Sequence, residues 1–210
     1  MTSLNLALMT DPDIIYDGVM ARWQPDAGER LRVAALDLFE ERGFEQTSVA
    51  QIAQRAELTE RTFYRHYGDK REVLFRGQDW LNELLATGVA DAPGTGALEV
   101  AGEVLARAAT FFDDDQRSVS RRRQQVIDAN PELVERERAK MAQLALALTG
   151  AFRARGVSDV RAAVSAGTVV SAFQVTFELW VAPAETRDFV ELGRAVVGEL
   201  RAALAADAAL

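Results

Sequence analysis

The sequence predicts an all-α protein in which a small N-terminal helix-turn-helix domain precedes a larger helical domain. Apolar residues recur at helical spacing in one segment after another, and capping residues and glycines mark where the segments end. No segment has the pattern of a β-strand. Residues 12–23 have the pattern of a short amphipathic helix. The predicted parts are an N-terminal extension (1–25), the helix-turn-helix domain (26–71) and the second helical domain (72–210).

The composition excludes several kinds of site. The 210 residues, 49% of them hydrophobic, suffice for one or two units with packed cores. Cysteine is absent and His66 is the only histidine, which excludes disulfides, thiolate metal sites and histidine-rich metal sites. The chain offers no glycine-rich phosphate loop and no Glu-x-x-His pair. We therefore expect no catalytic residues, no cofactor and no metal, and hence a protein that is not an enzyme.

The charge is unevenly distributed. The net charge is −8, yet residues 59–71 hold four cations against two anions. The acidic excess lies elsewhere and can keep the body soluble without opposing a basic surface. No basic segment precedes the apolar residues of the N-terminus, which together with the lack of cysteine favours a cytoplasmic protein. Residues 162–177 are uncharged but short for a membrane span and interrupted by polar residues, so we interpret them as a buried helix.

Capping motifs divide the N-terminal domain into three helices. The first spans residues 26–42, from an Asp26–Glu29 capping box to a left-handed stop at Gly43. A second capping box, Ser48–Gln51, opens the second helix, and Thr59 caps the third. These two short helices and the tight turn between them have the form of a helix-turn-helix.

The third helix separates apolar from cationic side chains. Phe63 and Tyr67 are four residues apart and share one face, while Arg61 and Arg65 fall nearly opposite, with Tyr64 beside them. A helix packed from behind with arginines in front suits entry into the major groove of DNA. Arginine can donate two hydrogen bonds to O6 and N7 of one guanine.

Polar residues that flank this helix are placed to meet backbone phosphates, which position a protein without reading sequence. They are Thr47, Tyr64, His66 and Lys70. Ser48 and Thr59 are helix caps first and phosphate contacts second. Taken singly, His66 would be an ordinary surface or core histidine and each arginine a solvated charge. The prediction depends on their joint spacing.

Within residues 30–74, the chain resembles the TetR family of bacterial transcriptional regulators. The resemblance is carried by Ile52-Ala53, Ala56, the run from Thr62 to Tyr67, and Asp69-Lys70. It implies an all-helical homodimer, usually a repressor, that releases DNA when a small molecule binds to the C-terminal domain. It also implies that residues around Arg61 and Thr62 approach bases. The complete set of predicted DNA-contacting residues is Thr47, Ser48, Thr59, Arg61, Thr62, Tyr64, Arg65, His66 and Lys70.

Two positions depart from the family pattern. Members commonly have glycine in the turn between the second and third helices, where this chain has Glu57. A left-handed backbone at that position would strain Glu57 by roughly 1–2 kcal/mol. Position 61 is often small in the family and is arginine here, so a family operator preference does not transfer.

The rest of the chain is predicted to be helical. An Asp69–Glu72 capping box opens a long helix to about Thr87, and residues 90–96 form a linker. Further helices are predicted over residues 97–112, 118–129, 131–155, 158–181 and 184–205, with a break at residues 113–115.

The helix over residues 158–181 is apolar nearly all round and must be covered on more than one side. We expect one face to line the core and the other to meet a second copy of the chain. With the last helix it would form an intermolecular four-helix bundle, and Ala163, Gly167 and Ala172 would allow close approach. The alternative is a buried helix in a monomer.

Large apolar residues of the second domain could line an elongated ligand cavity, although aromatic residues at helical spacing are more often core. An arginine of the 121–123 run, for which we select Arg123, could meet a carboxylate or phosphate at its mouth. This domain also loosely resembles those of TetR-family members that bind acyl-CoA-like ligands. The predicted ligand residues are Trp80, Leu84, Phe111, Phe112, Arg123, Val126, Met141, Phe173, Phe177 and Trp180.

The leading hypothesis is a ligand-responsive regulator, most often a repressor, that a small amphipathic or apolar molecule releases from its operator. Its expected partners are operator DNA, an effector and a second copy of the chain, and no membrane. A continuous helix over residues 69–87 would transmit the signal when a ligand wedges against Trp80 or Leu84. The alternative is a helical small-molecule-binding or scaffold protein without sequence-specific DNA binding.

Overall fold

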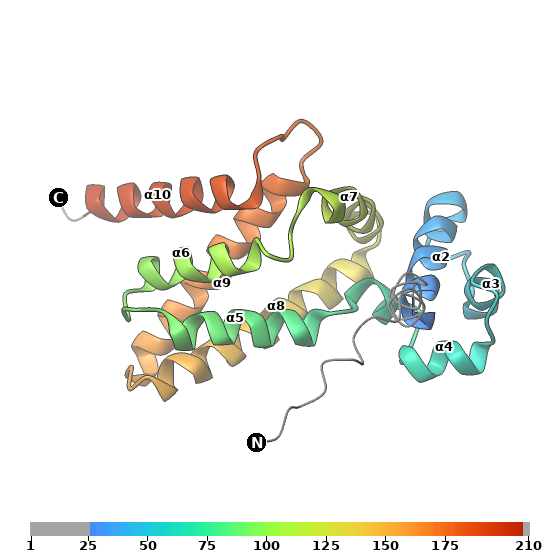
Figure 1. The fold of residues 1–210 in the computed structure, drawn as a ribbon, viewed down its shortest axis with the longest axis horizontal. Helices are drawn as coiled ribbons and strands as arrows, with labels where there is room; N and C mark the ends of the chain where they lie inside the picture. The colour runs from blue at the N-terminus through green and yellow to red at the C-terminus, as the bar shows by residue number, and fades with distance from the viewer. Residues whose placement is uncertain (1–25, 208–210) are drawn as a thin grey trace, which may run out of the picture. The chain divides into compact units, whose positions relative to one another are not determined.

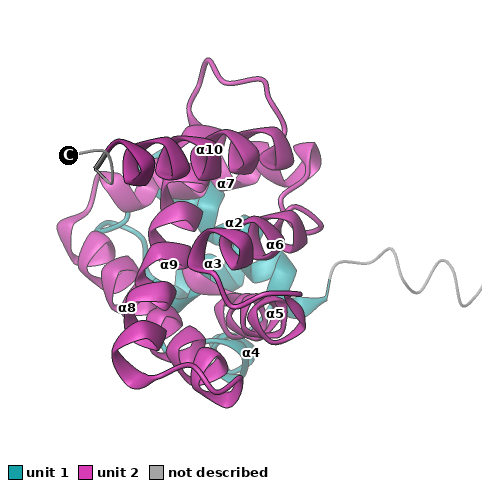
Figure 2. Cartoon of the chain, turned by 90° about the vertical axis from the view of Figure 1, so that its left-hand side faces the viewer, with its two compact units in different colours: residues 1–73 teal, residues 74–210 magenta. Residues whose placement is uncertain are grey.

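A computed structural model of the chain describes residues 26–207, and the predicted helix over residues 12–23 lies outside this part. The described residues form nine α-helices and one 3-10 helix and contain no strand, so the predicted all-α class is confirmed (Figure 1). The chain divides into two compact units between Val73 and Leu74 (Figure 2).

The N-terminal unit holds three helices: α2 (Ala27–Arg42), α3 (Val49–Arg55) and α4 (Glu60–His66). Their starts follow the predicted caps. The Asp26 carboxylate accepts a hydrogen bond from the backbone N–H of Glu29 at 2.8 Å, and Ser48 and Gln51 form a complete capping box. The Glu29 side chain pairs with Arg32.

The core of this unit is formed by side chains from all three helices. Leu31, Ile52 and Phe63 are fully buried, one from each helix. Tyr67 is also buried, and its hydroxyl donates a 2.8 Å hydrogen bond to the carbonyl of Gly28 at the start of α2. This bond ties the end of α4 to the first helix.

The predicted continuous helix from Asp69 to Thr87 is wrong. The Asp69 carboxylate does accept hydrogen bonds from the backbone N–H groups of Arg71 and Glu72. However, a 3-10 helix (η1, Arg71–Phe75) follows, and α5 (Gln78–Asp91) begins only after Gly77. Gly77 adopts a left-handed conformation with φ of 84° and ψ of 0°, which glycine tolerates without steric cost and which interrupts a helix.

The C-terminal unit contains α5 and five further helices: α6 (Ala97–Ala108), α7 (Asp114–Asp128), α8 (Pro131–Ala154), α9 (Asp159–Val181) and α10 (Phe189–Asp207). Helix α9 packs against α6, α7, α8 and α10, and α5 packs against α6 and α8. α9 is long and apolar enough for a membrane span, but Ala162, Val169 and Trp180 on it are buried against the unit's own core.

Several helix limits in this unit differ from prediction, and α6 ends at Ala108 instead of residue 112. Residues 113–115 are the start of α7 instead of a break, because Asp113 caps the helix at the N–H of Gln116, and acidic residues suit the positive end of a helix. The last helix begins at Phe189 instead of Ala184. Asp188 and Glu191 form the box that opens it, with hydrogen bonds of 2.7 Å and 3.2 Å.

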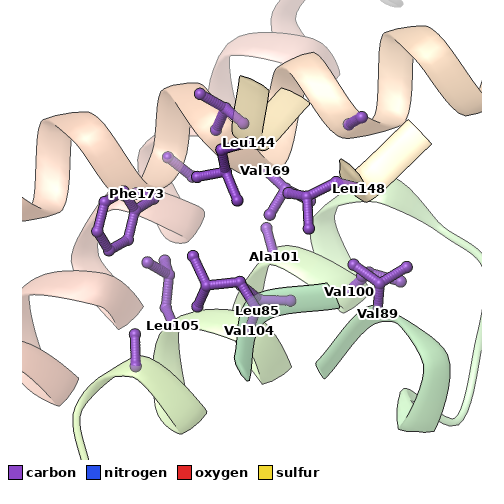
Figure 3. Close-up of a cluster of buried hydrophobic side chains, with 14 of the residues drawn as sticks. Leu85, Val89, Val100, Ala101, Val104, Leu105, Leu144, Leu148, Val169 and Phe173 are labelled. Carbon is purple, nitrogen blue, oxygen red and sulfur yellow. The ribbon is translucent and has the colours of Figure 1, made fainter. Parts of the chain in front are cut away.

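The core of the C-terminal unit gathers aliphatic side chains from several helices. Figure 3 shows Leu85 of α5, Val104 of α6, Leu148 of α8 and Val169 of α9 turned toward one another. All four are fully buried. This core holds together the unit that carries the predicted ligand residues.

Candidate nucleic-acid interface

The turn between α3 and α4 is closed by backbone hydrogen bonds. The N–H of Leu58 donates to the carbonyl of Ala53 at 2.8 Å, and the N–H of Glu57 donates to Gln54 at 3.0 Å. Glu57 has φ of 55°, and no other non-glycine residue in the described part of the chain has positive φ. The left-handed conformation costs a residue with a Cβ roughly 1–2 kcal/mol. The packing of α3 and α4 onto α2 therefore imposes a conformation that glycine would adopt more easily.

Helix α4 has a buried face and an exposed face. Phe63 is fully buried and Tyr67 is 5% exposed, with their ring centroids 5.4 Å apart. Tyr64 is 56% exposed, and Arg61 and Arg65 are also exposed. The aromatic anchor fixes the rotation of the helix, so both guanidinium groups are available to a surface in front of it.

The two predicted threonines at helix starts differ in what their hydroxyls do. Thr59 caps α4, with its oxygen accepting from the N–H of Thr62 at 3.1 Å and lying 3.0 Å from the Thr62 hydroxyl. Thr47 is 2% exposed, and its hydroxyl lies 2.9 Å from the carbonyl oxygen of Gly43 and 3.3 Å from that of Leu38. The Thr47 backbone N–H also donates to the carbonyl of Phe44 at 3.3 Å, so both of its donors are used inside the fold.

Lys70 is held in place by Phe44. Its ammonium donates to the carbonyl of Phe44 at 2.7 Å and lies 4.1 Å from the centroid of the Phe44 ring. An ammonium has three donors, so this arrangement leaves capacity for a phosphate. Sequence reasoning missed Phe44, and the available signal was a lone aromatic residue directly after the Gly43 stop. His66 is exposed on the last turn of α4, and Ser48 is exposed at the start of α3.

The six aromatic residues among the predicted ligand residues form a continuous chain of ring contacts, in which Phe111 links Trp80 to Phe112 with a Phe111–Phe112 centroid distance of 5.0 Å. Phe112, Phe173, Phe177 and Trp180 come together with Phe189 in an aromatic cluster. Trp80 and Phe111 contact each other with ring centroids 5.0 Å apart, but both are exposed, Trp80 by 48%. Val126 is buried, and Leu84 and Met141 are partly buried.

Arg123 faces protein groups. Its Nε donates to the carbonyl of Leu74 at 2.6 Å, and its guanidinium forms a 3.1 Å ion pair with Glu137 and lies over the Phe75 ring. Burial lowers the pKa of Arg123, and the Glu137 carboxylate opposes that shift.

Two other arginines of α7 hold the segment between α9 and α10, residues 182–188, which we call the strap (the loop at the top of Figure 1). Arg117 donates to the carbonyls of Glu185 and Arg187 at 3.1 Å and 2.5 Å. Arg121 donates to the carbonyls of Val181, Ala182 and Glu185 at 2.9–3.1 Å. Sequence reasoning missed Arg117, because nothing in its local pattern distinguishes a buried arginine from a solvated one.

A half-open cavity of about 310 Å³ lies between α6 and α10. None of the predicted ligand residues lines it. The lining residues are Gly102, Leu105, Ala106, Val190, Gly193, Arg194, Val197, Gly198 and Arg201.

Comparison with known proteins extends these observations. Residues 31–76 match the family described as "Bacterial regulatory proteins, tetR family". The transcriptional regulator TcmR of Streptomyces glaucescens is 51% identical over 39 residues, which are 19% of this chain and 17% of TcmR. The match thus spans less than a fifth of either protein.

Solved structures share the fold across most of the chain. The SmeT–triclosan complex aligns with a TM-score of 0.60 at 20% identity, covering 85% of this chain and 91% of SmeT. A TetR-family regulator from Mesorhizobium loti gives 0.53 at 19% identity, over 87% and 98% of the two chains. FadR from Bacillus subtilis, in complex with stearoyl-CoA, gives 0.53 at 18% identity, over 80% and 95%.

The described residues thus hold a helix-turn-helix unit followed by a larger helical unit. The match over residues 31–76 shows that the N-terminal unit carries the domain of the TetR family, and the solved structures share the fold over 80–87% of the chain. The predicted resemblance to the TetR family is confirmed over the matched residues.

Proposed function

We propose that the protein is a ligand-responsive repressor that binds operator DNA through α4. The observation that carries the proposal is the exposed face of α4, where Arg61, Tyr64 and Arg65 lie opposite the buried Phe63. Arg61 and Arg65 would donate to base edges in the major groove. The start of α3 and Lys70 would contact phosphates on either side.

The test is a gel-shift titration of the full chain against DNA from upstream of its own coding sequence, repeated over a range of salt. The logarithm of affinity should fall with the logarithm of salt concentration by about 0.9 per phosphate contact. A flat salt response, or equal binding to unrelated DNA, would favour the alternative of a helical binding or scaffold protein.

We also propose that the regulator is a homodimer. Val160, Val164 and Val175 of α9 are 78%, 65% and 44% exposed and lie on one face with Gly167 and Ser171. An exposed apolar stripe of this kind favours burial against a symmetric copy. Ala195 and Ala202 are exposed on α10 and would extend the surface.

The dimer proposal is tested by sedimentation of the wild type and of Val164→Asp. A charge placed in the centre of the stripe should convert a dimer into monomers. Glu135→Gln on the exposed surface of α8 serves as the control. A wild-type chain that sediments as a monomer would contradict the proposal.

The proposed effector is a small apolar or amphipathic molecule bound in the C-terminal unit. SmeT and Bacillus subtilis FadR, which share the fold, were solved with triclosan and with stearoyl-CoA. The effector would change the separation of the two α4 helices, which must lie about 34–36 Å apart, or a multiple of that, to fit successive major grooves. Gly77, between η1 and α5, is the residue at which we expect the chain to bend.

A further inference from the structure

Two buried nitrogen atoms of the C-terminal unit have no hydrogen-bond partner among the described residues. They are Nε of Arg117, a residue that is 7% exposed, and Nε1 of Trp180, a residue that is fully buried. They lie close together, since the Arg117 guanidinium carbon is 5.3 Å from the centroid of the Trp180 ring. Buried donors are nearly always paired. Two unpaired donors on side chains in contact therefore indicate a position for an acceptor from outside the chain.

The charges around these donors favour an anion. Arg117 and Arg121 donate mainly to neutral carbonyl oxygens of the strap and the end of α9. The carboxylate nearest to Arg117 is that of Asp114, at 3.3 Å, and the Asp114 side chain is 85% exposed. Glu185 in the strap is directed to Arg187 instead. The Asp114 carboxylate is screened by solvent. A buried guanidinium therefore interacts more strongly with an anion buried beside it than with this exposed carboxylate.

Aromatic rings pack around Trp180. The Phe112 and Phe189 rings stack with centroids 4.8 Å apart, and each lies within 6 Å of the Trp180 ring. Such surfaces favour a flat apolar group in offset or edge contact. The ring faces suit an aromatic group, and the two N–H donors and the positive charge suit a carboxylate. A small aromatic carboxylate combines both.

We propose that a small aromatic carboxylate binds beneath the strap, with its oxygen atoms accepting hydrogen bonds from Arg117 Nε and Trp180 Nε1. Entry requires the strap to lift, which breaks hydrogen bonds between its carbonyls and Arg117. The strap joins α9 to α10, the two helices of the proposed dimer interface. An effect of the bound carboxylate on DNA binding rests on the proposed function. The binding site itself does not rest on it.

The experiment follows the three indole N–H resonances of the full chain by NMR during titration with benzoate. The tryptophans are Trp23, Trp80 and Trp180. The Trp180 signal, assigned as the one missing from Trp180→Phe, should shift downfield and saturate, while the Trp80 signal stays in place. Benzyl alcohol, which carries no charge, should leave the Trp180 signal unmoved at equal concentration.

Calorimetry gives the second readout. Trp180→Phe removes the donor and part of the buried ring system, so it should weaken benzoate binding by about tenfold, as expected for loss of a hydrogen bond to a charged group. It should also lower the melting temperature of the free protein, because the smaller ring leaves a cavity in the core. Arg138→Ala, on the exposed surface of α8, should bind benzoate as the wild type does. An unmoved Trp180 signal, or unchanged benzoate affinity in Trp180→Phe, would overturn the site.

Gel shifts with and without benzoate separate the two proposals. A shifted Trp180 resonance with no effect on DNA binding would leave the site standing and reject its role as an effector site. A chain that binds benzoate but no DNA would reject the proposed repressor and leave the site intact.

Discussion

Both units begin helices with local caps, as Asp113 and Asp188 show for α7 and α10, but the C-terminal unit also has a connecting segment that is held by side chains distant in sequence. In the N-terminal unit, Asp26, Ser48 and Thr59 each cap a helix at a backbone N–H three residues ahead. In the C-terminal unit, the end of α9 and the strap are held by Arg117 and Arg121, which lie 60 to 70 residues away along the chain. Local hydrogen bonds hold the helices of the N-terminal unit, which we call the platform. In the C-terminal unit, the strap is held in place by the side chains of Arg117 and Arg121, which come from α7.

This difference fits the proposed function, in which the N-terminal unit presents a fixed face and the C-terminal unit moves. The N-terminal unit must keep Arg61 and Arg65 in a constant orientation. The strap can detach from α7 without any helix unfolding, because its anchoring bonds come from side chains. The predictions that follow test first the rigidity of the platform and then the attachment of the strap.

The largest effect is expected at the anchor of α4. Phe63→Ala removes a fully buried ring and should lower the free energy of unfolding of the N-terminal unit by about 3–5 kcal/mol. Tyr64→Ala, one residue on and 56% exposed, should change it by less than about 0.5 kcal/mol. Hydrogen exchange of the α3 and α4 amides measures both. Equal losses would mean that α4 is not held by its buried face.

The second effect concerns recognition by the platform. Arg61→Ala and Arg65→Ala should each cost about 1–3 kcal/mol of operator affinity if the guanidinium reads a base, and should relax the sequence preference. The unfolding free energy should stay unchanged, because both side chains are exposed. Arg138→Ala on the exposed surface of α8 is the control. Gel shifts against operator variants measure the loss, and unchanged affinity in both variants would exclude α4 as the reading helix.

The contrast between the units also explains what could be predicted from the sequence. The limits of α2, α3 and α4 depend on residues within a few positions, so Ser48 and Thr59 were sufficient to locate two of them. The start of α10 was misplaced by five residues, although the Asp188–Glu191 capping box that opens the helix is a local signal in the sequence. The break at Gly77 was missed because the sequence does not indicate whether a glycine inside a helical pattern adopts a negative φ or, as here, a positive one.

Side-chain partners were the least predictable part of the candidate sites. Arg123 was selected as the inward arginine, yet it pairs with Glu137, and Arg117 is the more buried of the two. Which arginine of α7 points inward depends on how α7 packs on α9, and the composition of the helix does not contain that information.

A smaller effect is expected in the turn of the platform. Glu57→Gly should raise the free energy of unfolding by about 0.5–1 kcal/mol, because relief of the left-handed strain exceeds the entropy that glycine loses on folding. Ala56→Gly, at the neighbouring residue with φ of −79°, should lower it by about 0.5–1 kcal/mol. Urea unfolding measures the free energy of unfolding of both variants. Changes of the same sign in the two variants would contradict left-handed backbone strain as the cause.

The smallest effect tests the strap through pH. The Arg187 side chain and then its backbone N–H hold the pKa of Glu185 at about 2, below its usual value of 4.5. A carboxyl group with a lowered pKa in the folded state stabilises the fold above the unfolded pKa, and this contribution is lost as pH falls from about 4.5 toward 2. Glu185→Gln should therefore flatten the dependence of melting temperature on pH in this window, while Glu135→Gln on α8 keeps the wild-type profile. Because the group lies near the surface, salt should weaken the effect. A profile that Glu185→Gln leaves unchanged would mean that the strap is held by the carbonyl bonds to Arg117 and Arg121 alone.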